Sequence, residues 1–61
     1  MNEKEIYQDA LDAIRMSDGL IDFDEWAPGW MINEKGEYVN DDNKLKALKV
    51  IWDKAIAKIN K

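Results

Sequence analysis

The sequence predicts an α+β fold in which two amphipathic helices pack with a small central two-stranded β-hairpin. An apolar stripe with helical spacing lies near each end of the chain, and two short apolar runs flank a turn between them. An all-α fold with an irregular centre is the alternative. A length of 61 residues allows one small globular domain, residues 1–61.

The first helix is predicted over residues 3–17. Asn2 suits the N-cap because its side chain can accept free backbone N–H groups of the first turn, and Glu5 follows at a spacing close to a capping box. Gly19 can adopt the left-handed conformation that commonly ends a helix. The apolar residues that share one face are Ile6, Tyr7, Ala10, Leu11, Ala13 and Ile14.

Two shorter segments fill the centre of the chain. In residues 20–29, Asp22 can start a short helical turn, and we expect Pro28 and the glycine after it to end that turn because proline lacks a backbone donor. Residues 30–39 are predicted to form the β-hairpin. Asparagine at position 33 and glycine at position 36 are typical of a type I turn that ends in a positive φ.

The last helix is predicted over residues 41–60. Asn40, Asp41 and Asp42 place capping groups and negative charge at its N-terminal end, which favours the helix dipole. Its apolar stripe is expected to face the first helix and the hairpin. The predicted core of the whole domain is Ile6, Ala10, Leu11, Ile14, Leu20, Phe23, Trp30, Ile32, Leu45, Leu48, Trp52, Ala55 and Ile59.

Several kinds of chemistry are excluded by composition. The chain has no cysteine and no histidine, which removes disulfides, thiol nucleophiles, imidazole acid–base catalysis and the usual zinc ligands. Ser17, the single serine, therefore has no histidine to activate it, and we predict no catalytic residues, no cofactor and no enzymatic activity. We expect a cytoplasmic protein without a signal peptide and without a membrane span, because no apolar stretch approaches about 20 residues.

The segment from Asp18 to Glu25 resembles the second half of an EF-hand calcium loop, with Glu25 at the position of the bidentate glutamate. That resemblance implies oxygen ligands at two earlier loop positions. Ile14 and Met16 occupy these positions, and neither side chain can bind a hard cation. We therefore predict a helix end followed by solvated carboxylates here, and no metal site.

Charge is divided unevenly along the chain. Residues 1–43 carry twelve acidic and three basic side chains, a net charge of −9, whereas residues 44–61 carry six lysines and one acid, a net charge of +5. The acidic side chains form either a surface for a basic partner, a solvated face, or ion pairs with the lysines of the last helix. The candidate partner-binding residues are Glu5, Asp9, Asp12, Asp22, Asp24, Glu25 and Trp26.

The three tryptophans are the remaining candidates for partner contact. In so small a chain a core position is the better prediction for each, because a buried aromatic side chain removes a large apolar area from water. Trp26 lies next to Pro28 and, of the three, is the one that we also include among the candidate partner-binding residues.

The function predicted from these features is that of a small acidic protein-interaction module. Its size and lysine-, isoleucine- and asparagine-rich composition favour a phage or mobile-element accessory or inhibitor protein that binds a larger bacterial protein with a basic surface. Nucleic-acid binding through Lys46, Lys54, Lys58 and Lys61 is one alternative, although negative net charge and the lack of a stacking aromatic on that side disfavour it. Self-association through an apolar strip left on the last helix is another.

Overall fold

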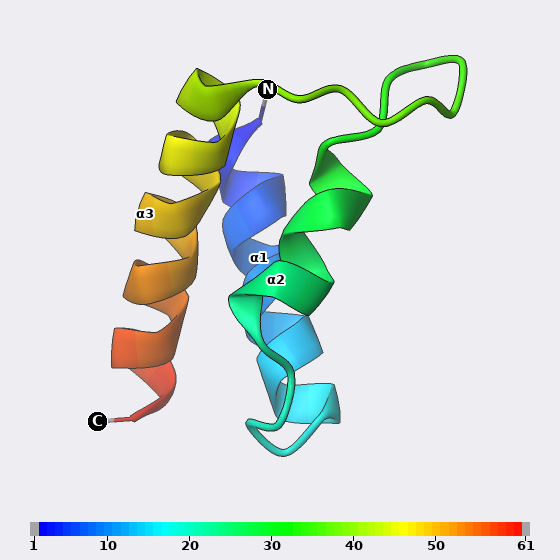
Figure 1. Cartoon of the computed structure of the whole chain (residues 1–61). Coiled ribbons are helices and arrows are strands. Elements are labelled where there is room, and N and C mark those ends of the chain that lie inside the picture. Colours follow the sequence, from blue (N-terminus) through cyan, green and yellow to red (C-terminus); the bar gives the residue numbers. More distant parts are fainter. Residues whose placement is uncertain (1, 61) are drawn as a thin grey trace.

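The computed structural model describes residues 2–60 and shows three α-helices with one 3₁₀ turn (Figure 1). The elements in chain order are α1 (Glu3–Met16), α2 (Phe23–Trp26), η1 (Ala27–Trp30) and α3 (Asp42–Ile59). Helices α1 and α3 pack side by side and run in the same direction, while α2 and η1 return in the opposite direction. Residues 32–41 then extend away from the helices and cross to the start of α3 (Figure 1).

Both ends of α1 are fixed by local hydrogen bonds. The Asn2 side chain accepts the backbone N–H groups of Lys4 at 3.1 Å and of Glu5 at 3.3 Å, which confirms the predicted N-cap. At the other end Gly19 adopts a φ of 80° and donates its N–H to the carbonyl of Ile14 at 2.8 Å. Helix α1 therefore begins at the predicted residue and ends one residue before the predicted boundary.

The short helix α2 begins after Asp22, as the sequence suggested, but Pro28 does not end the helical path. The chain continues as the 3₁₀ turn η1, in which Pro28 is the second residue. Proline is tolerated there because the first N–H groups of a helix have no intrahelical acceptor. The carbonyl of Pro28 accepts the N–H of Met31 at 3.1 Å and closes the turn.

The prediction of an α+β fold is wrong. Among residues 2–60 there is no β-strand, and the hairpin expected over residues 30–39 is reduced to one isolated antiparallel bridge between Ile32 and Tyr38. Trp30 belongs to η1 and Met31 is buried among the helices, so the first apolar run is taken by helical packing. Ile32 and Tyr38 are 49% and 57% exposed, and a two-residue ladder without a packed face is not stable as a sheet.

Helix α3 is capped by Asp41, whose side chain accepts the N–H groups of Asn43 and Lys44. It spans residues 42–59, one residue inside each end of the predicted range. Leu20 and Ile32 were predicted in the core and are exposed, whereas Phe23, Trp30, Leu45 and Ile59 are partly buried against it. The observed core is Ile6, Ala10, Leu11, Ile14, Trp26, Ala27, Met31, Leu48, Ile51, Trp52 and Ala55.

An aromatic cluster joins α2 to α3. The rings of Trp26 and Trp52 stack with their centroids 4.9 Å apart, and the ring of Phe23 lies 6.2 Å from each of them. The amino group of Lys49 covers the Phe23 ring at 5.1 Å from its centroid, a cation–π contact. These contacts hold the short α2 helix in place, since four residues are far too few to be helical on their own.

Candidate protein-binding surface

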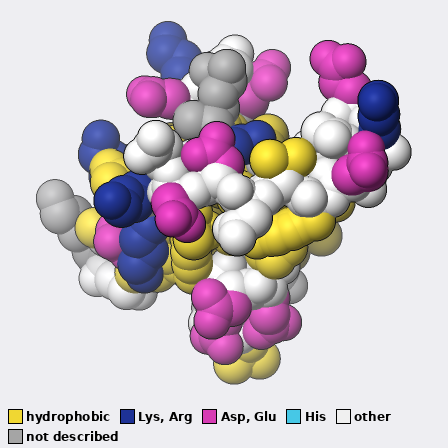
Figure 2. All heavy atoms as spheres, turned by 45° about the horizontal axis from the view of Figure 1, so that its top comes forward, with side chains coloured by type: hydrophobic (Ala, Val, Ile, Leu, Met, Phe, Trp, Pro, Cys, Tyr) yellow, Lys and Arg dark blue, Asp and Glu magenta, His cyan; other side chains and the backbone are white. Residues whose placement is uncertain are grey.

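The six acidic candidates are all exposed, and they form two groups. Glu5, Asp9 and Asp12 lie along one side of α1, because positions three and four residues apart share one side of a helix. The other group lies at the start of α2 and consists of Asp22, Asp24 and Glu25. We call these six residues the acidic face. Figure 2 shows a cluster of acidic side chains at the bottom of the view, while further acidic side chains and the basic side chains are spread over the upper part.

Asp9 differs from the other members because its carboxylate has a structural role. One oxygen, Oδ2, accepts hydrogen bonds from the indole Nε1 of Trp26 at 3.0 Å and from the indole Nε1 of Trp30 at 2.9 Å. This carboxylate therefore ties α1 to both α2 and η1. A buried indole needs an acceptor for its N–H, so Asp9 also satisfies the one polar atom of Trp26, which is 6% exposed.

Trp26 is therefore part of the interior, where it stacks on Trp52, and its side chain has almost no surface to offer a partner. The core position predicted as the better choice for each tryptophan is confirmed for Trp26 and Trp52, whereas Trp30 is only partly buried. Trp26, which was included among the candidate partner-binding residues, instead packs in the interior beneath the acidic face.

Among the described residues, the other members of the acidic face form no ion pair. Among residues 2–60 the only salt bridge joins Lys49 to Asp53 at 3.3 Å, within α3. Asp12 accepts a hydrogen bond from the neutral side chain of Gln8 at 2.9 Å, and the Glu25 carboxylate accepts the backbone N–H of Asp22 at a long 3.5 Å. The alternative in which the acidic side chains pair with the lysines of α3 is thus not what the described residues show.

A hydrogen-bonded turn lies between the two acidic groups. Residues 16–22, which we call the anchor turn, expose the side chains of Met16 and Leu20 by 87% and 82%, the largest exposed fractions among the large hydrophobic residues described. Asp18 and Asp22 stand beside them in the chain and are also exposed. Two large apolar side chains are thus exposed in one short segment that also carries two exposed carboxylates.

The backbone of the anchor turn is fixed by hydrogen bonds at successive residues. Asp18, with a φ of 54°, donates to the carbonyl of Arg15, and Gly19 donates to Ile14, the pair of bonds that defines a Schellman motif. The Ser17 hydroxyl donates to the Ile14 carbonyl at 3.1 Å and accepts the N–H of Ile21 at 3.1 Å. The exposed side chains are therefore carried by an ordered backbone.

The exposure of these apolar side chains was not predicted from the sequence. Leu20 was predicted in the core, and Met16 was considered only as an unsuitable calcium ligand. In a Schellman motif an apolar residue beyond the helix commonly packs back on the last turn, which makes burial the ordinary expectation. The structure also differs from the EF-hand that residues 18–25 resemble. Met16 lies inside α1, whereas the corresponding position of an EF-hand belongs to the calcium-binding loop. Residues 2–60 contain no group of three or more acidic side chains placed to hold a metal ion.

The lysine side of α3 is exposed at Lys46, Lys54 and Lys58, while Lys61 lies outside the described residues. Val50, 54% exposed, lies between these lysines on the helix surface. The aromatic residue of α3, Trp52, is 2% exposed and faces the core, so the described part of this side offers no ring for base stacking.

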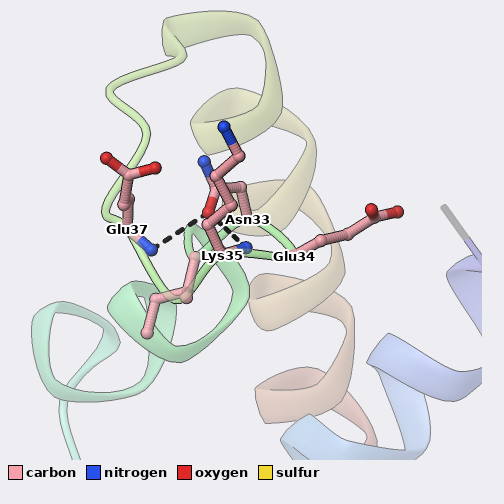
Figure 3. A pocket seen from close by; sticks show the side chains of 5 residues that line it. Asn33, Glu34, Lys35 and Glu37 are labelled. Carbon is pink, nitrogen blue, oxygen red and sulfur yellow. Dashed lines mark hydrogen bonds between the residues drawn. The ribbon is translucent and has the colours of Figure 1, made fainter.

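The loop beyond η1 forms an open hollow lined by Ile32, Asn33, Glu34, Lys35 and Glu37 (Figure 3). Its centre is occupied by hydrogen bonds of the chain itself, because the Asn33 side chain accepts the backbone N–H groups of Lys35 at 2.9 Å and Glu37 at 3.0 Å. The carboxylates of Glu34 and Glu37 point away from each other (Figure 3). This arrangement gives no convergent set of polar groups for a small molecule.

Comparison with protein-family models, with curated proteins and with solved structures finds no match to this chain. The helices of residues 2–60 include none whose length and apolar content would let it cross a bilayer.

Proposed function

We propose that this chain is a small protein-interaction module that binds a larger protein with a basic surface. The proposed binding surface consists of the anchor turn and of the acidic face other than Asp9, whose carboxylate is already engaged by two indole groups. In keeping with its size and composition, we place it among the accessory or inhibitor proteins of phages and mobile elements that act on bacterial proteins.

The anchor turn is the observation that supports this proposal most strongly. Its backbone is held by hydrogen bonds on both sides of Gly19, yet Met16 and Leu20 remain almost fully in water. An ordered segment loses little conformational entropy on binding, so burying these two side chains can contribute directly to affinity. Each would contribute about 1.5–3 kcal/mol if fully buried in a partner.

The carboxylates around the anchor turn have a different effect. Exposed charges at the rim of an interface accelerate association and select the partner's charge, while contributing modestly to affinity. Because Asp18, Asp22 and Asp24 form no ion pair among residues 2–60, they are free to meet lysine and arginine side chains of another molecule. This division of roles predicts that apolar changes alter dissociation and charge changes alter association.

The test is capture of partners from the cells that express the chain, with three matched baits. The first is the wild type, the second carries Leu20→Glu with Asp12→Lys, and the third carries Glu34→Lys with Glu37→Lys on the distant loop. We expect basic proteins retained by the first and third baits to be lost from the second. Asp9 is left unchanged, because a lysine there would remove the acceptor of two indoles and confuse unfolding with lost binding.

Retention of the same proteins by the second bait, shown to be folded by circular dichroism, would refute the proposed surface. Recovery of nucleic acid rather than protein by all three baits would favour the alternative based on the lysines of α3.

A further inference from the structure

A shallow depression lies on α1 and α3, away from the acidic face. It is lined by Tyr7 of α1 and by Lys54, Ala57 and Lys58 of α3, with a volume of ≈ 410 Å³. A smaller hollow of ≈ 170 Å³ shares Tyr7 and Lys54 with it and extends along the seam between the two helices. We call the larger depression the seam groove; it has room for one or two aliphatic side chains.

The chemistry of the seam groove follows from its four lining residues. The Tyr7 ring and the Ala57 methyl group supply apolar surface, and the amino groups of Lys54 and Lys58 stand beside it. Neither lysine forms a salt bridge within residues 2–60. The groove therefore suits an apolar side chain that is accompanied by carboxylates.

The groove faces away from α2. Lys49 covers Phe23 of α2, and Lys58 is nine residues further along α3, which places it on the opposite side of a helix with about 3.6 residues per turn. The anchor turn, in contrast, joins α1 to α2. One molecule thus carries the groove and the anchor turn on different parts of its surface.

We infer that the seam groove of one copy binds the anchor turn of a second copy, so that the protein associates with itself head to tail. Leu20, flanked in the chain by Asp18 and Asp22, presents the combination of charges and apolar surface that the groove suits. The charges are complementary across this contact, and the like-charged pairing of two acidic faces is avoided. The inference rests on the proposed function in one respect, since both use the anchor turn.

A head-to-tail contact joins two different surfaces, so it can produce an open chain of copies as well as a closed ring. Each added copy leaves one groove and one anchor turn unoccupied, so the assembly grows with concentration unless the geometry forms a ring. Lone copies and short chains are expected to coexist, because a single turn buries much less area than a standard stable interface.

The test is sedimentation velocity of the full chain at rising concentration. The wild type is expected to increase in average mass, whereas Leu20→Glu and Ala57→Glu are each expected to remain monomeric, with self-association at least about tenfold weaker. Lys54→Glu is a second groove variant that changes charge without filling the groove. Lys46→Glu is the matched control, because Lys46 is an exposed lysine of the same helix that lines neither hollow.

Mixing the two monomeric variants gives the decisive result. The Leu20→Glu chain retains a groove and the Ala57→Glu chain retains an anchor turn, so a mixture should form a 1:1 dimer of twice 7.1 kDa and nothing larger. A wild type that stays monomeric at about 1 mM, or a mixture that stays monomeric where the wild type associates, would overturn the inference.

The groove variants also separate this inference from the proposed function. Ala57→Glu leaves the acidic face and the anchor turn intact, so it should still capture a basic partner. Loss of self-association with partner capture retained supports both proposals, and a monomeric wild type that captures its partner overturns only the head-to-tail contact.

Discussion

Replacing Asp9 by alanine is the sharpest test of how the domain is held together. The change removes the acceptor of two indole N–H groups, one partly buried on Trp26 and one exposed on Trp30. A hydrogen bond to a charged group contributes about 1.5–3 kcal/mol when buried and much less when exposed. Because one oxygen serves both donors, we expect a loss of about 2 kcal/mol, which for a domain of this size lowers the melting temperature by roughly 8–16 °C.

The assay is thermal unfolding followed by far-UV circular dichroism and by tryptophan fluorescence. Asp12→Ala is the matched control, because Asp12 is an acid of the same helix whose carboxylate accepts only from Gln8, and it should change stability by less than about 0.5 kcal/mol. Asp9→Asn keeps an acceptor oxygen and should fall between the two. If Asp9→Ala melts at the temperature of Asp12→Ala, the carboxylate does not tie α2 and η1 to α1.

Two further changes test the core and the helix end. Trp52→Ala removes the ring that stacks on Trp26 and should cost about 3–5 kcal/mol, comparable with the whole stability of so small a domain, so we expect loss of cooperative unfolding by circular dichroism. Gly19→Ala meets no atom within 4 Å but forces a side chain into a φ of 80°, and urea titration should show a loss of about 1 kcal/mol; an unchanged midpoint would mean that the anchor turn relaxes freely.

The helices could be predicted because their signals are local. The Asn2 and Asp41 side chains cap α1 and α3 through hydrogen bonds to residues two and three positions away, and such short-range patterns are visible in the sequence. The apolar stripes of both helices were also correctly oriented, with Ile6 and Leu48 fully buried.

The hairpin could not be excluded in this way, because its failure depends on the whole domain. Asn33 and Gly36 do form the expected tight turn, with the Gly36 N–H donating to the Asn33 carbonyl at 3.0 Å. The pairing extends only from the Val39 N–H, which donates to the Met31 carbonyl at 2.7 Å, to the Asn33 N–H, which donates to the Glu37 carbonyl at 2.9 Å, because Trp30 before it belongs to the 3₁₀ turn η1. The local sequence signal therefore predicted the turn correctly, but the β-hairpin around it does not form.

The sequence predicted the acidic side chains of the candidate site correctly as exposed, but it did not predict the positions of Trp26, Asp9 and Leu20. Exposure of the acids follows from their spacing on α1, but the sequence cannot show that Trp26 and Trp30 converge on Asp9 from residues 17 and 21 positions away. That convergence gives Asp9 a structural role, and the exposure of Leu20 removes it from the predicted core.

The structural role of Asp9 gives a physical reason for regarding the other acids as available for binding. The interior described here contains no buried polar or charged residue, and no salt bridge among residues 2–60 links α1 to α3. Stability therefore depends on apolar packing and on the Asp9 carboxylate, while like charges such as Glu5 and Asp9, four residues apart, slightly oppose the helix. Glu5 and Asp12 have no such structural role among residues 2–60, so reversing these two charges while Asp9 is kept should leave the fold unchanged, and under the proposed function it should weaken binding.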